Sequence, residues 1–193
     1  MNKCNCCGKC CQTSPPTLHL EDKSLILNDI ISKNNLITLR KGEVVFDHTA
    51  SKYVFISQEL VKLVTKNNAC IFLSKQNKCL IYSNRPIECK YFLCTNQKYI
   101  LQIKNKHILN RFNLISINSA IGNIIQEHEQ ICSIEKIKEC IINKKEGKLK
   151  EMILFDINLR EILKEKLSIP NDRLNFYFGR PVTTIINIIK TFV

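Results

Sequence analysis

The stretch Cys4-Asn5-Cys6-Cys7-Gly8-Lys9-Cys10-Cys11 places five cysteines within the first eleven residues. Thiolate is a soft ligand that suits zinc and iron–sulfur clusters, whereas calcium or magnesium would need carboxylates, and none precedes Glu21. Gly8 has no Cβ, so it can adopt the positive φ that a tight turn around an ion requires. This stretch therefore predicts a thiolate metal site.

A second group of cysteines follows far along the chain: Cys70, Cys79, Cys89 and Cys94. We expect the two groups to meet in space. A disulfide framework is the alternative, but the total of 11 cysteines is odd. The first residues also lack the apolar stretch and the small-residue cleavage site of a secretory signal, which favours a reducing cytoplasm. The cysteine pattern therefore favours metal over disulfides.

The residues around the second group read as short strands joined by a turn. β-Branched and apolar runs predict strands at 60–64, 71–73 and 80–82, with a turn at 76–77 that would bring Cys70 close to Cys79. Pro86 restricts both itself and the residue before it, so it would form a rigid corner that aims Cys89. Arg85 beside it is equally well explained as a donor to a thiolate or as an ordinary salt bridge.

The pattern CxxCGxCC, followed by Cys70-x8-Cys79, Tyr82 and Arg85-Pro86-x-x-Cys89, resembles the YkgJ-type CxxCxxCC cysteine-cluster family. That family is described as a zinc- or iron-chelating domain, and it is related to the flagellin lysine N-methylases, which carry an iron–sulfur cluster. The resemblance covers about the first half of the chain. It implies that the family's cysteine positions are Cys4, Cys7, Cys10, Cys11, Cys70, Cys79 and Cys89.

Two positions depart from the family pattern, because Lys90 stands where Arg is usual and Leu93 where Pro is frequent. Neither change removes a ligand. Cys6 is additional to the pattern, and Cys94 falls where the pattern is looser. The resemblance implies metal binding more firmly than it implies any reaction. The candidate metal ligands are Cys4, Cys7, Cys10, Cys11, Cys70, Cys79, Cys89 and Cys94.

Eight candidate ligands are more than one centre needs. Four thiolates complete a tetrahedral zinc site or hold one [4Fe–4S] cluster. Either two centres are bound or some thiols are spectators. Adjacent cysteines such as Cys10 and Cys11 would point in different directions in an extended chain, which favours one ligand for each of two sites or one ligand beside a free thiol.

The net charge of +12 is concentrated around the second cysteine group. Between residues 60 and 126 the only acidic residue is Glu88, and the basic residues are Lys62, Lys66, Lys75, Lys78, Arg85, Lys90, Lys98, Lys104, Lys106 and Arg111. Such a face compensates a negative thiolate site or meets an acidic partner. Without a nucleic-acid motif or an aromatic platform, the charge disfavours nucleic acid as the partner.

The predicted fold class is α+β, with a small cysteine-rich metal-binding half of short strands and hairpins packed on a C-terminal helical half. We place these halves at residues 1–104 and 105–193, and we expect them to pack together as one unit. Helices are predicted at 21–33, 107–125, 133–143 and 156–167, with a last one opened by Pro181 and another starting at Ser57. A hairpin is predicted for 36–40 and 43–47 around Lys41-Gly42.

Several single residues carry expectations of their own. Ser133 and Asp156 are predicted as helix N-caps, and Gly147 as a break between helices. Cys132 and Cys140 are interpreted as buried small hydrophobic residues. The four histidines are scattered, and His48 is the one nearest to the cysteine-rich half. No apolar stretch has the length of a membrane span.

Two functions remain open at this stage. The first is a cytoplasmic metal protein, with an iron–sulfur cluster or zinc, that supports redox or group-transfer chemistry such as methyl transfer, with a protein partner or substrate. The second is a non-enzymatic module that zinc stabilises and whose basic face binds an acidic partner. Motifs for nucleotide binding and for serine or HExxH hydrolysis are absent from the sequence.

Overall fold

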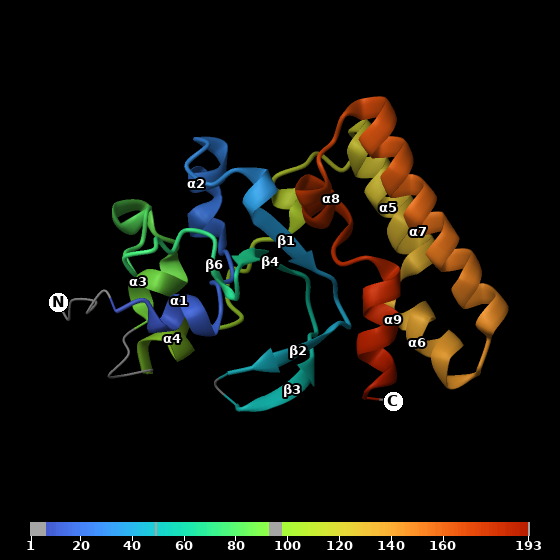
Figure 1. Ribbon diagram of the computed structural model, residues 1–193, viewed down its shortest axis with the longest axis horizontal. Helices are drawn as coiled ribbons and strands as arrows, with labels where there is room; N and C mark the ends of the chain where they lie inside the picture. The colour runs from blue at the N-terminus through green and yellow to red at the C-terminus, as the bar shows by residue number, and fades with distance from the viewer. Residues whose placement is uncertain (1–6, 49, 93–97, 193) are drawn as a thin grey trace.

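The computed structural model describes residues 7–48, 50–92 and 98–192, and it has the α+β architecture that the sequence predicts. The cysteine-rich half carries short helices and three two-stranded sheets, and the other half is helical (Figure 1). Within the described residues, no helix has both the length and the apolar character needed to cross a bilayer.

The strands of the first half pair in three antiparallel ladders. β1 (Leu36–Leu39) pairs with β4 (Leu60–Leu63), β2 (Val44–Asp47) with β3 (Lys52–Phe55), and β5 (Thr65–Lys66) with β6 (Ala69–Cys70). The hairpin predicted between 36–40 and 43–47 is therefore wrong in its pairing. Gly42 does turn the chain, with φ 88°. However, the two strands then diverge, and each finds a partner from 52–63, where we had expected a helix to start at Ser57.

Short helices surround these ladders. They are α1 (Lys9–Thr13), α2 (Lys23–Leu27), α3 (Ile87–Tyr91) and α4 (Lys98–Ile103), with single 3₁₀ turns η1 (Leu20–Asp22), η2 (Lys33–Asn35), η3 (Tyr82–Asn84) and η4 (Arg111–Asn113). The predicted helix at 21–33 is thus present but shorter, because Asp29 adopts φ 54° and interrupts it.

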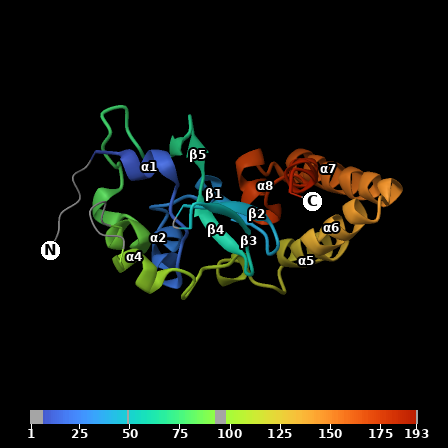
Figure 2. The ribbon, with the colours of Figure 1, turned by 90° about the horizontal axis from the view of Figure 1, so that it is seen from below.

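Among the described residues of the second half, five α-helices follow η4. They are α5 (Ala120–Cys132), α6 (Ile134–Ile142), α7 (Glu146–Leu167), α8 (Asn171–Phe178) and α9 (Val182–Lys190). Figures 1 and 2 show α5, α6 and α7 at the end of the molecule opposite to α1, with α8 between them and β1. Segment 107–119 is not helical beyond η4, so the helix predicted at 107–125 begins later, at the Ser119 cap.

Two apolar cores hold the molecule together. The larger contains residues of both halves, and four of its members, Leu18, Val61, Leu174 and Phe178, are each at most 1% exposed. The smaller lies among α6, α7 and α9, and it includes Cys132 and Cys140. These two cysteines are 0% and 4% exposed, which confirms their interpretation as buried hydrophobic residues.

Ser133 caps α6 as predicted, since its hydroxyl accepts a hydrogen bond from the Lys136 amide. Asp156 is not a cap, because α7 already begins at Glu146 and passes Gly147 without a break. Instead, Asp156 is buried in mid-helix, where its carboxylate accepts hydrogen bonds from His128 at 2.9 Å, Arg160 at 2.8 Å and the Val182 amide at 3.0 Å. A buried carboxylate here joins α5, α7 and α9.

We expect this cluster to make the protein less stable in acid. Burial lowers the pKa of His128 below 6.5, so the unfolded chain takes up a proton at a pH where the folded chain does not. Stability therefore falls as the pH drops below 6.5. Burial raises the pKa of Asp156, but the hydrogen bonds from His128 and Arg160 outweigh it and lower this pKa to about 2. The contribution of Asp156 to stability is therefore lost only as the pH falls below 3.8.

Urea unfolding between pH 8 and pH 5 measures the His128 contribution. His128→Gln keeps a side-chain donor without a titrating group, so the free energy of unfolding should depend less on pH than in the wild type. His107→Gln, at an exposed histidine far from this cluster in the sequence, should retain the wild-type dependence. Identical profiles for His128→Gln and the wild type would contradict the assignment.

Two glycines should respond to alanine in opposite directions. A Cβ at Gly122 in α5 would lie 2.3 Å from the Ser116 carbonyl oxygen and 2.7 Å from that of Ile117, and these backbone atoms cannot move aside easily. Gly122→Ala should destabilise the protein by about 1–3 kcal/mol. A Cβ at Gly147 in α7 meets nothing within 4 Å, so Gly147→Ala should stabilise it by up to about 1 kcal/mol. Thermal unfolding of both variants checks the two signs.

Candidate metal centre

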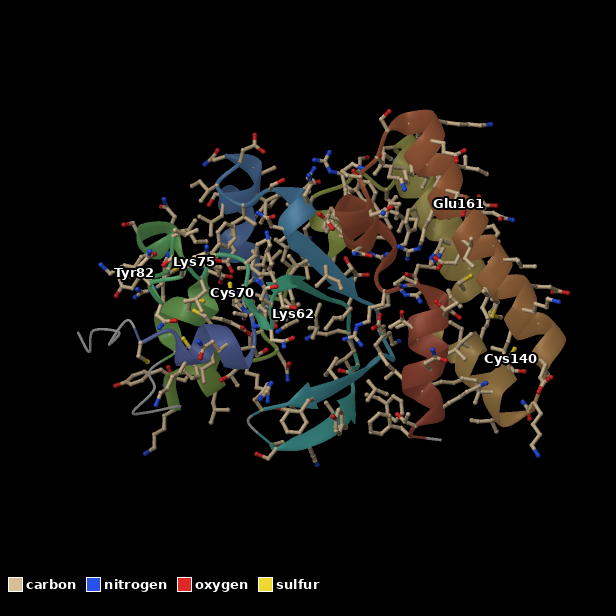
Figure 3. All side chains as sticks on the ribbon, in the orientation of Figure 1. Lys62, Cys70, Lys75, Tyr82, Cys140 and Glu161 are labelled. Carbon is tan, nitrogen blue, oxygen red and sulfur yellow. The ribbon has the colours of Figure 1, made fainter. Side chains whose placement is uncertain are left out.

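Five cysteines from four separate segments line one cavity, which has a volume of about 550 Å³. We call it the thiol cavity. Cys10 and Cys11 come from α1, Cys70 from the end of β6, Cys79 from the loop that follows, and Cys89 from α3. Segments almost eighty residues apart in the chain therefore bring their sulfurs to the same space, on the α1 side of the molecule (Figure 3).

Gly8 positions α1 against the loop that carries Cys79. It has φ 73°, and a Cβ there would lie 3.2 Å from Asn77 Cβ and 3.2 Å from Leu73 Cδ1. Both the positive φ and this close approach favour glycine. The turn predicted at Gly8 is thus present, and it packs the first cysteine segment onto the second one.

The loop between Cys70 and Cys79 is only partly the predicted hairpin. A single bridge joins Leu73 to Cys79, and Asn77 makes the turn with φ 58°. The strand predicted at 80–82 is wrong, because Leu80 lies in a turn and Tyr82 starts η3. Both side chains are exposed, at 68% and 38%, so no buried face holds this segment in a sheet.

The corner before Cys89 is built as the sequence predicts. Arg85 is extended, with φ −65° and ψ 148°, and Pro86 stands immediately before the first turn of α3. The Arg85 guanidinium lies over the Tyr82 ring, 4.1 Å from its centroid, and its charge contributes to lowering the pKa of Cys10. Arg85 therefore lies close enough to Cys10 to affect its charge, which agrees with one of the two roles that the sequence left open for it.

Two acidic residues that sequence reasoning missed fix the direction of α3. The carboxylate of Asp22 accepts a hydrogen bond from the Ile87 amide at 2.8 Å and another from the His19 amide at 3.0 Å. Glu88 accepts one from the Thr17 amide at 2.7 Å. The signal that could have indicated Glu88 is its isolation, since it is the only acidic residue between 60 and 126, whereas Asp22 carries no such signal.

The sulfurs of Cys10 and Cys11 lie 3.9 Å apart. We had expected an extended chain that points them in different directions, but the segment is the short helix α1, and the two thiols face the same cavity. Their hydrogen bond lowers the pKa of Cys10 to about 6 and raises the pKa of Cys11. One thiol of this pair therefore ionises well before the other.

Burial raises the pKa of both Cys70 and Cys89, and the neighbouring thiols add to this increase. Without a cation these sulfurs stay protonated near neutral pH. A bound metal reverses that preference, because a coordinated thiol is deprotonated. Soft sulfur donors surrounded by basic residues fit zinc or an iron–sulfur cluster better than they fit a hard cation.

The remaining predicted ligands either do not line the thiol cavity or lie outside the described residues. Cys7 is exposed and lines neither this cavity nor the other one described below. Cys4, Cys94 and the additional Cys6 lie outside the described residues. Among residues 7–48, 50–92 and 98–192, no group of three or more Cys, His, Asp or Glu side chains is already arranged around one ion position. His48 lines the thiol cavity.

The fold and this cavity define a cysteine-rich metal-binding domain that is combined with a helical region. A family model confirms that class: residues 3–109 match CxxCxxCC, described as "Putative zinc- or iron-chelating domain". The match spans more than half of the chain, and the chain belongs to this family. No curated protein and no solved structure matches the chain.

Proposed function

We propose that the thiolates of the thiol cavity hold an iron–sulfur cluster that is accessible to a reactant and supports redox or group-transfer chemistry. The observation that carries this proposal is the convergence of five cysteines on a space of about 550 Å³. The ligands would be drawn from Cys10, Cys11, Cys70, Cys79 and Cys89, together with Cys4, Cys7 and Cys94. Such a cluster supplies electrons or activates a sulfur-bound group.

The size of the cavity favours a reactive centre over a purely structural one. Structural zinc sites are closed by four ligands, whereas catalytic metal sites keep a position open. The thiol cavity has more volume than a closed four-ligand site needs, and its wall continues from the cysteines to Phe46 and Val54 of the β2–β3 hairpin. We therefore propose that a second molecule reaches the metal from that side.

The test is metal and acid-labile sulfide analysis of the full chain purified without oxygen. We expect about four iron and four sulfide per chain for each cluster held, with the brown colour of such a centre. Zinc without sulfide would contradict the cluster and favour the zinc-stabilised module. The absence of both metals from protein expressed with both supplied would contradict the metal centre itself.

A further inference from the structure

A second cavity, of about 640 Å³, adjoins the thiol cavity. We call it the hairpin cavity, because the β2–β3 hairpin forms one wall and α9 another. The two cavities share lining residues, among them Phe46, His48 and Lys62. In the view of Figure 3, Lys62 lies above the hairpin, and both Lys62 and Cys70 line the thiol cavity. The two cavities therefore share a wall, and Lys62 belongs to that wall.

The lining of the hairpin cavity is apolar and positively charged. Its aromatic members contact one another, since the rings of Phe46 and Tyr53 have centroids 5.2 Å apart and those of Tyr53 and Phe192 4.8 Å apart. Its charged members are Lys62 and Arg180, and among the described residues no Asp or Glu lines it. Both volumes lie in the range of small-molecule sites.

The ammonium of Lys62 is available to a ligand. Its one hydrogen bond to a described residue goes to the Thr17 hydroxyl at 3.1 Å, and no described carboxylate lies within 4 Å of it. Glu88 is near, but its oxygens accept from the Thr17 amide and contact His19. Arg180 differs, because its Nε lies 3.5 Å from the buried carboxylate of Glu43. Lys62 is half-buried, and the charges of Glu88 and Cys89 act on it without either side chain forming an ion pair with it, so its ammonium can still pair with an anionic ligand.

We propose that the hairpin cavity binds a small organic carboxylate with an aromatic or aliphatic body. Its carboxylate would pair with Lys62, and its body would lie against Phe46, Tyr53 and Phe192. This ligand site goes beyond the metal centre, because none of its contacts is a thiol, yet it would place the bound molecule beside the cysteines.

Isothermal titration of the full chain, purified without oxygen, with 4-phenylbutyrate tests the proposal. We expect binding that Lys62→Met weakens at least about tenfold, since a hydrogen bond to a charged group is lost. The metal content of this variant should equal that of the wild type. The control is Lys138→Met. Lys138 stacks on the Phe55 ring but lines neither cavity itself, so this variant should bind 4-phenylbutyrate as the wild type does.

Two further ligands and one further variant make the test decisive. 4-Phenylbutylamine, with the opposite charge, and acetate, without the body, should bind at least about tenfold more weakly. Phe192→Ala, at a half-exposed ring beyond α9, should weaken 4-phenylbutyrate without disturbing the core. Three outcomes would overturn the site: no binding of 4-phenylbutyrate to the wild type, equal binding of the amine, or wild-type affinity for 4-phenylbutyrate in both Lys62→Met and Phe192→Ala. A loss of metal from Lys62→Met would assign Lys62 to the metal centre instead.

Discussion

Cys89→Ser is expected to lower the metal content of the purified protein to less than half of the wild-type value. Cys89 lies in the middle of α3, whose direction Asp22 and Glu88 fix through hydrogen bonds to the Ile87 and Thr17 amides. A serine hydroxyl at this place is a harder and weaker ligand for zinc or iron than a thiolate. Iron and zinc per chain, measured by elemental analysis, give the result.

The matched control is Cys140→Ala. Cys140 is as buried as Cys70, at 4% and 7% exposure, but it belongs to the smaller core among α6, α7 and α9. Its removal should leave the metal content unchanged, and it should cost some stability through the small cavity that it leaves. Wild-type metal in Cys89→Ser would remove Cys89 from the proposed ligands. Equal losses in both variants would point to general unfolding.

Arg111→Met is expected to reduce the free energy of unfolding by about 3–5 kcal/mol, because it leaves Glu59 without its buried cation and leaves Glu129 with only the more distant Arg40, at 3.8 Å. The Arg111 side chain is 2% exposed. Its guanidinium donates to Glu59 at 2.7 and 2.9 Å, to Glu129 at 2.8 Å and to the Tyr177 carbonyl. It therefore connects η4, the segment before β4, α5 and α8.

Arg173→Met supplies the comparison, because Arg173 also joins distant segments but its hydrogen bond goes to a neutral side chain, Asn34, at 2.8 Å. We expect a loss below about 1.5 kcal/mol there. Chemical denaturation followed by far-ultraviolet circular dichroism measures both variants. Comparable losses in the two would show that burial of the Arg111 ion pairs adds nothing to their effect.

The sequence was most informative where one local rule decides the outcome. The runs at 60–64 and 133–143 form β4 and α6, and Pro181 does precede the last helix. It was least informative where strands choose partners. Nothing local distinguishes β1 pairing with β2 from β1 pairing with β4, because the choice depends on the burial of Leu36 and Val61 in the larger core.

The candidate site shows the same contrast between features that the sequence predicts and features that it does not. Cysteine spacing and the family resemblance together indicated Cys10, Cys11, Cys70, Cys79 and Cys89, which the fold brings to one cavity. It could not indicate that Lys62 from β4 lies between this cavity and the next one, since a lysine that alternates with Val61 and Leu63 is typical of the exposed face of a strand. That arrangement depends on where the distant α9 packs.

The hydrogen bonds of Asp22 have a consequence for how the protein matures. This carboxylate links residue 19 to residue 87, and backbone bonds from Leu18 to Val61 and from Leu109 to Leu18 extend the same framework. No sulfur takes part in these links. These hydrogen bonds therefore hold the segments that carry the cysteines near one another without an ion, unlike zinc fingers, which are unfolded without metal. The last step left to a metal would be to draw the thiols themselves together, because among the described residues no three ligand side chains are already arranged around one ion position.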